Sequence, residues 1–256
     1  PYELTYLLDN CDAKIIITQA AGEKKYNEIK DRLTSCHQAY IISPEGITTG
    51  SDKDKNFNVG DVAPVTIEPD DPAQIIYTAG LTGKPLGAVL THGNLCAELN
   101  MIQPIFRRQP DDVGLCLIPL FHSFGATVNM LNVIQAGCST VMMDRLTMET
   151  LFSAIEKEKI SYICSVPRLY VGMVFEEKAA KHDLSSLKLC VTGGSAMPPE
   201  FIPVFEQKFG ARLLEGYGLT EAAPACSFNR IERTAKHGSI GTALDGIDIK
   251  IVDDEG

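Results

Sequence analysis

The chain has 256 residues, of which 45% are hydrophobic and 22% charged, and its net charge is −10. This composition is typical of a globular protein with about one or two domains and excludes a disordered or fibrous chain. The acidic balance argues against bulk binding to nucleic acid, so we expect no nucleic-acid partner. The sequence also lacks an apolar stretch of the roughly 18 residues that a membrane-spanning helix needs.

The start of the sequence has no secretory signal, which predicts a cytoplasmic protein. Its eight cysteines never form a C-x-x-C pair, so we expect buried, reduced thiols rather than metal ligands. The chain opens on Pro1 and stops in an acidic run, and we expect both ends to be cut from a longer protein. Apolar surface at cut edges would favour self-association.

The first third of the chain combines β-branched segments with turn-forming residues. Between residues 44 and 72 the composition shifts to Gly, Pro, Asp, Ser and Lys, which is typical of a long surface loop or an internal linker. A helix is expected to open near Gly93 or Asn94, with His92 as its cap. Strands are expected at residues 14–18, 39–43, 74–78 and 88–91.

Strands and helices then alternate more regularly. Thr147 is expected to cap one helix, and Pro167 to lie in the first turn of another. We expect strands at residues 115–118, 139–143, 162–166 and 187–192, and helices at 125–135 and 148–159, from 167, and from 198 or 199.

This alternation predicts an α/β fold with mostly parallel sheets, flanked by helices in layers. Residues 239–244 and 248–252 are expected to be strands with no helix between them, so a β-barrel-like element would start at the C-terminal end. We therefore expect a first α/β subdomain at 1–105, a second at 106–230 and the start of a β subdomain at 231–256.

A glycine-rich loop at residues 75–87 is the sharpest local signal. Its glycines allow a tight turn that brings backbone N–H groups close to an anion. It is not a Walker A loop, because Pro85 follows the Gly83-Lys84 pair. On spacing alone a structural turn and a phosphate cradle are equally open. The residues of interest are Thr78, Gly80, Thr82, Gly83, Lys84 and Gly87.

Five segments in order resemble motifs of the adenylate-forming superfamily, which includes acyl-CoA synthetases, luciferases and the adenylation domains of peptide synthetases. The glycine-rich loop resembles its phosphate loop, and residues 119–125 resemble the acyl-site motif of fatty-acyl-CoA synthetases. Residues 192–198 resemble the segment that lines the adenine and acyl sites. Residues 215–221 resemble the adenine and magnesium motif, and residues 238–242 the motif that follows it.

The resemblance implies an acid–thiol ligase. A carboxylate would attack the α-phosphorus of ATP, pyrophosphate would leave, and CoA would take the acyl group. It implies ATP, Mg²⁺ and CoA as cofactors or co-substrates, with no nucleophile supplied by the protein. It also leaves open a peripheral membrane contact of the full-length protein. The family's ribose-binding aspartate motif and its C-terminal lid with the catalytic lysine are absent, so we expect an internal fragment that is inactive in isolation.

The resemblance also assigns roles to residues. Thr220, Glu221 and His122 would be catalytic, with Glu221 as the magnesium ligand. The acid would be bound by Phe121, His122, Phe124, Gly125 and Gly194. ATP would be bound by Thr78, Gly80, Thr82, Gly83, Lys84, Gly87, Gly193, Gly194, Ser195, Ala196, Glu215, Gly216, Tyr217, Gly218 and Thr220.

Each of these side chains also fits a plain structural role. Glu221 and Lys84 fit solvated loop residues, Tyr217 a core tyrosine, His122 a partly buried histidine and Thr220 a helix cap. Phe121, Phe124, Val128 and Met130 would surround an elongated apolar pocket, with room left by Gly125 and Ala126, and such a pocket suits a fatty acid better than an amino acid.

The glycine-rich loop departs from the family pattern. Ala79 and Leu81 stand where the family has hydroxyl residues, and Leu86 stands where it has a lysine. Each lost hydrogen bond to a charged phosphate would cost about 1.5–3 kcal/mol. Two alternatives therefore remain beside the fatty acid–CoA ligase. One is an acyl-AMP or acyl-carrier-protein ligase, and the other is a nucleotide-binding module that has lost catalysis.

Overall fold

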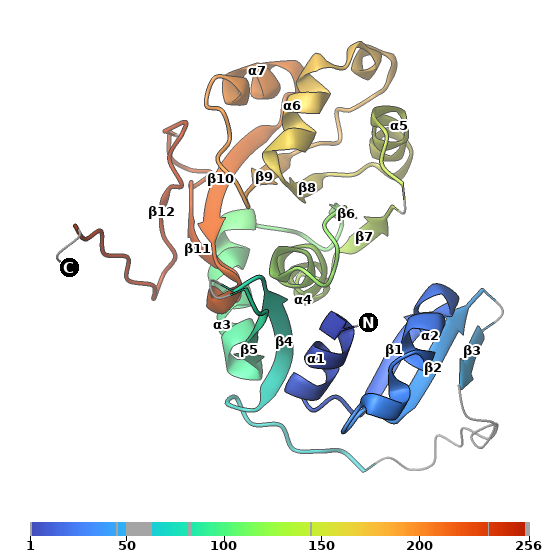
Figure 1. Cartoon of the computed structure of the whole chain (residues 1–256). Coiled ribbons are helices and arrows are strands. Elements are labelled where there is room, and N and C mark those ends of the chain that lie inside the picture. Colours follow the sequence, from blue (N-terminus) through green and yellow to red (C-terminus); the bar gives the residue numbers. More distant parts are fainter. Residues whose placement is uncertain are drawn as a thin grey trace. The chain divides into compact units, whose positions relative to one another are not determined.

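A computed structural model describes residues 2–44, 46–49, 63–80, 83–143, 145–234 and 236–253 (Figure 1). The chain forms two compact units. Unit 1 comprises Pro1–Ile67 and Tyr77–Gly87, and unit 2 comprises Glu68–Ile76 and Ala88–Gly256. The finer division at residues 105 and 230 stays a prediction.

Unit 1 is built on a small three-stranded sheet in the order β1-β2-β3. β2 pairs parallel to β1 and antiparallel to β3. β3 lies within the segment expected to be a loop, so that expectation is wrong at its start; residue 45 and residues 50–62 lie outside the described part. The elements are α1 (Tyr2–Asn10), β1 (Ile15–Gln19), α2 (Ala20–Asn27), η1 (Lys30–Arg32), β2 (Gln38–Ser43) and β3 (Gly46–Thr49).

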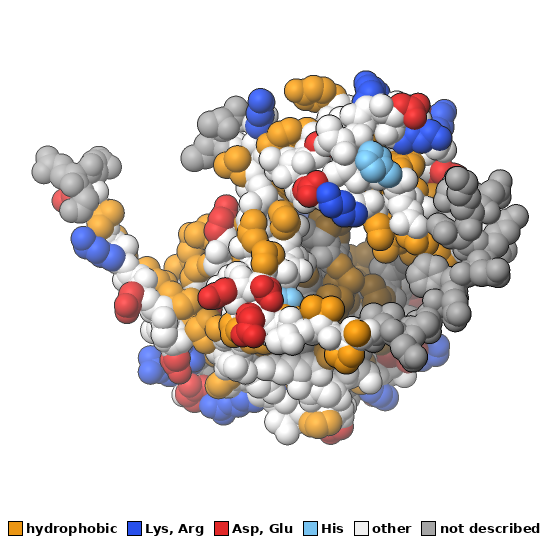
Figure 2. Space-filling view, turned by 90° about the horizontal axis from the view of Figure 1, so that it is seen from below, with side chains coloured by type: hydrophobic (Ala, Val, Ile, Leu, Met, Phe, Trp, Pro, Cys, Tyr) orange, Lys and Arg blue, Asp and Glu red, His pale blue; other side chains and the backbone are white. Residues whose placement is uncertain are grey.

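The two faces of this sheet differ in burial. Tyr26 of α2 and the following Ile29 pack with Ala39 and Ile41 of β2 in a small core. Since side chains alternate along a strand, Ile15, Ile17, Ile42 and Ile47 point to the other face, where they are 44–68% exposed. Hydrophobic side chains also reach the surface in several patches of the face shown in Figure 2.

Unit 2 contains a seven-stranded sheet in the order β12-β11-β10-β9-β8-β6-β7. The five strands from β10 to β7 are parallel to one another. β11 pairs antiparallel with β10, and β12 pairs antiparallel with β11. The mostly parallel α/β fold is thereby confirmed. The strands are β6 (Val113–Cys116), β7 (Ser139–Met142), β8 (Tyr162–Ser165), β9 (Leu189–Thr192), β10 (Arg212–Gly218), β11 (Ala225–Phe228) and β12 (Thr242–Ala243).

Helices cover both faces of this sheet (Figure 1). Alternate residues of β9 show this directly, because Cys190 packs into one core and Leu189 and Val191 into the other. The first core is made with α5, α6 and α7, and the second with α3 and η2. The helices are α3 (His92–Phe106), the π-helical η2 (Phe124–Leu131), α4 (Asn132–Gln135), α5 (Met148–Glu158), α6 (Pro167–Phe175), η3 (Glu177–Lys181), α7 (Phe201–Phe209) and η4 (Thr220–Ala222).

Local hydrogen bonds explain where the helices begin. Thr147 caps α5 as predicted, because its side chain accepts from the N–H of Thr150. Thr91 caps α3 through a reciprocal pair with Asn94, so the assignment of His92 as the cap is wrong. The hydroxyl of Thr91 can accept a backbone N–H at this spacing, and His92 is the first residue inside the helix.

The C-terminal segment is less regular than expected. Thr242 and Ala243 pair antiparallel with β11, which confirms an antiparallel element. Residues 248–252 are not a strand, so that prediction is wrong, and the part of the chain that the structure describes contains no closed barrel. A short hairpin (β4, Pro72–Thr78, and β5, Leu86–Thr91) forms a separate two-stranded sheet.

The cysteines are all free thiols. Five of them are buried, as expected: Cys36, Cys116, Cys164, Cys190 and Cys226. Among the described residues no helix has the length and apolar character needed to cross a bilayer.

Candidate active site

The topology of unit 2 points to one edge of its sheet as the place for a ligand. The chain runs from β6 to β7 on one side and then to β8 on the other side of β6. Open parallel sheets bind ligands outside the carboxyl ends of the strands, at such a change of direction. The loops that leave β6, β9 and β10 at this edge carry residues 119–125, 193–197 and 219–221.

The structure brings these three loops into contact. The hydroxyl of Ser123 donates to the hydroxyl oxygen of Thr220 across 3.4 Å. A Cβ on Gly193 would lie 3.4 Å from the carbonyl oxygen of Gly216 and 3.7 Å from the ring of Phe124. Ser123 and Thr220, which are 97 residues apart in the sequence, therefore meet in unit 2.

His122 lies at this edge with an exposed side chain. Its Nδ1 accepts a hydrogen bond of 3.2 Å from the backbone N–H of Phe124. This bond leaves the proton of the neutral imidazole on Nε2. His122 can thus present its Nε2–H to an anionic group, while the bond from the Phe124 N–H orients its ring.

A short turn between β10 and β11 presents Thr220 and Glu221. The N–H of Leu219 donates to the carbonyl of Pro224 across 2.8 Å and closes the turn. Glu221 is exposed at its tip, and Tyr217 before it is 42% exposed. Tyr217 is therefore not a core tyrosine, and its stacking on an adenine stays a prediction.

These oxygen donors fit a magnesium ion that also binds substrate phosphates. Mg²⁺ is usually held by one or two carboxylates, with phosphate oxygens and water as its other ligands. In the described part of the chain no three acidic, histidine or cysteine side chains gather at a metal-binding distance. The exposed carboxylate of Glu221, next to Thr220 in the sequence, suits a magnesium site in which phosphate oxygens and water are the other ligands.

Glu215 lies within β10, before the turn. It is buried, and its Oε2 accepts from the N–H of Gly238 across 2.9 Å. Burial raises the pKa of this carboxyl group, although the Gly238 N–H and His237 pull it down. Glu215 thus ties β10 to residues 238–242, the last of the segments singled out in the sequence.

The residues expected to bind the acid differ in exposure. Phe121 is 81% exposed, whereas Phe124 packs in the second core of unit 2 together with Val128. In the loop after β9, Gly194 adopts φ +82°, and the side chains of Ser195 and Ala196 are exposed. Contacts of these residues with an acyl chain or a nucleotide stay predictions.

Gly125 allows its backbone to pack closely against the carbonyl groups of Ile118 and Pro119. A Cβ there would collide with the carbonyl of Pro119 and lie 2.7 Å from that of Ile118. At Gly193 a Cβ would make only ordinary contacts. We expect Gly125→Ala to lower the free energy of unfolding by about 1–3 kcal/mol, and Gly193→Ala to change it much less, as measured by urea denaturation. Equal unfolding midpoints for the two variants would contradict this account of residue 125.

Residues 77–87 of the glycine-rich loop belong to unit 1. The hydroxyl of Thr78 donates to the carbonyl of Leu86 across 3.4 Å, between the two strands of the hairpin. Gly80 and Gly83 have positive φ values of 66° and 80°, a conformation that favours glycine. Gly87 lies in β5 and Lys84 is exposed, while Leu81 and Thr82 lie outside the described residues.

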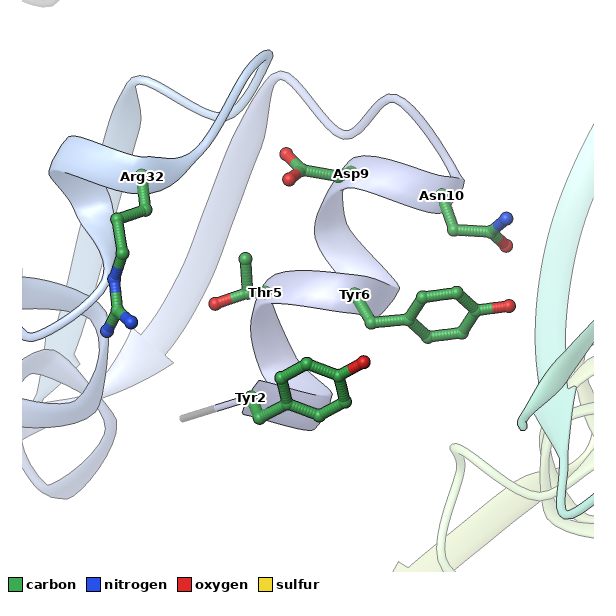
Figure 3. A pocket seen from close by; sticks show the side chains of 6 residues that line it. All are labelled: Tyr2, Thr5, Tyr6, Asp9, Asn10 and Arg32. Atoms are coloured by element: carbon green, nitrogen blue, oxygen red, sulfur yellow. The ribbon is translucent and has the colours of Figure 1, made fainter. Parts of the chain in front are cut away.

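Helix α1 supports this hairpin from within unit 1, which the sequence analysis missed. Tyr6 donates from its hydroxyl to the carbonyl of Pro85 (3.0 Å), and Tyr77 donates to Oδ1 of Asn10 (2.6 Å). Tyr6 and Asn10 also line a surface pocket of unit 1 together with Arg32 of η1, and in Figure 3 their side chains point away from Arg32. In the sequence, only the presence of Tyr6 and Tyr77, whose hydroxyls can donate hydrogen bonds, indicates such a contact.

The loop and Glu221 lie in different units, and each unit is described by itself. Their convergence on one triphosphate therefore stays a prediction. Within unit 2, by contrast, residues from four of the five segments lie together: Ser123 and Phe124, Gly193, Gly216 with Thr220, and Gly238 bonded to Glu215.

A doubly wound α/β unit with its motif-bearing loops at the carboxyl ends of the strands defines the class of this protein. Comparison with known proteins then gives the family. Residues 1–256 match the family described as AMP-binding enzyme, and the chain belongs to it.

Relatives in this family are CoA ligases of different acids. The chain is 31% identical to 4-coumarate–CoA ligase 2 of Oryza sativa subsp. japonica, covering 99% of this chain and 48% of that protein. It is 29% identical to the long-chain-fatty-acid–CoA ligase of Bacillus subtilis (strain 168), covering 99% of this chain and 50% of that protein. The chain thus spans about half the length of these relatives.

Solved structures show the same fold. The anthranilate CoA ligase AuaEII, in complex with anthranoyl-AMP, matches with a TM-score of 0.84 and 24% identity over 100% of this chain and 49% of its own. ATP-bound MatB from Rhodopseudomonas palustris matches with a TM-score of 0.79 and 21% identity, over 95% of this chain and 47% of its own. Both agree with the mixed α/β architecture described above.

Proposed function

We propose that the protein of which these residues form part activates a carboxylic acid with ATP and transfers the acyl group to the thiol of CoA. Family membership supports this reaction, and the contact between Ser123 and Thr220 is the observation in the structure that carries it. It joins the segment assigned to the acid with the segment assigned to the nucleotide.

The chemistry follows from the charges involved. A carboxylate oxygen attacks the α-phosphorus of ATP, the bond to pyrophosphate breaks, and the acyl-adenylate then has AMP as a good leaving group for attack by a thiol. Because two anions must approach each other, catalysis needs positioning and charge neutralisation. His122, through Nε2–H, would orient the carboxylate, and the Thr220 hydroxyl would bind a phosphate oxygen.

Tyr217 would stack on the adenine, and Glu221 would hold Mg²⁺, which neutralises phosphate charge when bound. The backbone N–H groups of the glycine-rich loop would bind the pyrophosphate part of ATP. The substitutions at Ala79, Leu81 and Leu86 leave these backbone donors in the sequence.

For the acid, we propose an apolar carboxylic acid, with fatty acids as the first choice. The apolar residues of the segment 119–130 support it, and so does the Bacillus subtilis relative, which is a long-chain-fatty-acid–CoA ligase. A hydroxycinnamate is the second candidate, because several relatives are named 4-coumarate–CoA ligases.

The test is exchange of labelled pyrophosphate into ATP with Mg²⁺ and a panel of acids. It is run on the 256-residue chain and on a longer polypeptide that contains it. We expect no exchange by the 256-residue chain and acid-dependent exchange by the longer polypeptide, more of it with fatty acids than with 4-coumarate or amino acids. Preference for 4-coumarate would reject the fatty acid and keep the reaction. No exchange by either polypeptide, with retained ATP binding in calorimetry, would instead support a nucleotide-binding module without catalysis.

A further inference from the structure

Glu98 of α3 is a buried acid that the proposed chemistry does not use. Its side chain is fully buried, and its Oε1 accepts a hydrogen bond of 3.0 Å from the backbone N–H of Ala225. Ala225 is the first residue of β11 and directly follows the turn that carries Thr220 and Glu221. The carboxyl group therefore anchors one end of this turn to a helix.

Within the rest of the turn, backbone hydrogen bonds are joined by one side-chain contact, the bond from the Ser123 hydroxyl to Thr220. The Leu219 N–H bonds to the Pro224 carbonyl, and the Ala223 N–H to the Thr220 carbonyl. Helix α3 is itself fixed at its start by the Thr91–Asn94 capping pair and in its last turns by the buried Ile102, Ile105 and Phe106. Loss of the bond between Glu98 and Ala225 would therefore release this end of the turn from α3.

The environment of the second carboxyl oxygen of Glu98 favours the protonated form of the side chain. Oε2 of Glu98 is buried and has no hydrogen-bond partner among the described atoms. A buried charge with one hydrogen bond is unfavourable, so the neutral acid is preferred. Burial raises the pKa of Glu98 from 4.5 to about 7, and the Ala225 N–H offsets this only in part.

The surroundings contain few charges that would alter this behaviour. Neither η2 nor α4, which pack on α3, has a titratable side chain, and β11 contributes the buried thiol of Cys226. The turn adds Glu221, which is exposed, and α3 itself adds only His92 and Cys96. No cation is therefore placed to hold Glu98 in its charged form within these elements.

We propose that Glu98 is a positioning residue of this active site: its neutral carboxyl group holds the turn of Thr220 and Glu221 in place, and its ionisation loosens that turn. The proposal rests on the proposed function for its effect on the rate. Its effect on the turn itself is independent of the reaction. Glu98 touches neither substrate nor metal and acts only through the backbone at Ala225.

The activity test uses pyrophosphate exchange by the longer polypeptide between about pH 6 and about pH 9, with kcat and KM for ATP measured separately. We expect the wild-type kcat to fall above about pH 7, and Glu98→Gln, which keeps the acceptor and cannot ionise, to lack this fall. Glu98→Ala should have an about tenfold lower kcat than the wild type at about pH 6, because the anchoring bond is gone, and no further fall above about pH 7. A Glu98→Gln profile equal to that of the wild type would overturn the proposal.

The structural test needs no activity. Amide hydrogen exchange of residues 219–226, corrected for the intrinsic dependence on pH, should show protection that decreases above about pH 7 in the wild type and not in Glu98→Gln. Glu206→Gln is the matched control, since Glu206 accepts from the N–H of Leu213 at the opposite end of β10 (3.0 Å) and should leave the turn unchanged. Equal dependence on pH in wild type and Glu98→Gln would refute the positioning role. Absence of pyrophosphate exchange in the wild type would refute only the proposed function.

Discussion

Glu221→Gln is expected to lower the rate of pyrophosphate exchange by about 10²–10³-fold, the effect of removing one electrostatic partner of a reacting group. The exposed carboxylate at the tip of η4 is replaced by a neutral amide of the same shape. The loss should be larger in kcat/KM at low Mg²⁺ concentration, because a carboxylate binds this ion far better than an amide does. The measurement is exchange kinetics over a titration of Mg²⁺.

Glu232→Gln is the control for this substitution. Glu232 is also an exposed acid of unit 2, paired with Arg107 across 3.2 Å, and exposed ion pairs contribute little. We expect it to keep wild-type exchange. If Glu221→Gln also keeps wild-type exchange and the same Mg²⁺ dependence, Glu221 is a solvated loop residue and the assignment of the metal to it is wrong.

The second large effect concerns stability. The pKa of Glu98 is 4.5 in its usual state and about 7 in the folded chain. Between these values the folded chain keeps a proton that the unfolded chain has released, so the wild-type free energy of unfolding should fall as the pH rises from 4.5 to about 7. The shift corresponds to roughly 3 kcal/mol in total.

Glu98→Gln has no such proton, so this contribution is absent from the variant. Its free energy of unfolding, minus that of the wild type, should therefore grow by roughly 3 kcal/mol between about pH 4.5 and about pH 8. Urea denaturation at both pH values measures this difference, with equal m values as the check that both chains expose the same surface. A difference that stays constant with pH would show that Glu98 is not buried as an acid.

The two glutamates illustrate what sequence patterns can and cannot reveal. Glu221 stands in a motif, and its exposed position on the short turn after β10 agrees with that interpretation. Glu98 stands alone in a helix between apolar residues, and nothing near it in the sequence marks it. Its role depends on Ala225, 127 residues away, because the Glu98 carboxyl group accepts a hydrogen bond from the Ala225 N–H.

The glycines show the same division. The sequence related Gly125 to space for a substrate. In the folded chain the close neighbours are the carbonyls of Ile118 and Pro119, so the requirement is also one of backbone packing. The apolar character of Phe124 and Val128 predicts an acyl pocket; the structure shows that both pack in the second core, and their contact with an acyl chain stays a prediction.

The sequence by itself determined the alternation of strands and helices, the cap of α5, the parallel α/β class and the family, because these depend on local periodicity, capping chemistry and short motifs. Tertiary structure alone decided which strands are neighbours and that the Ser123 and Thr220 hydroxyls meet. It also decided that the terminal residues 248–252 form no strand and that α1 supports the glycine-rich hairpin. These features depend on pairing between distant segments, whose hydrogen bonds and burial exist only once the chain has folded.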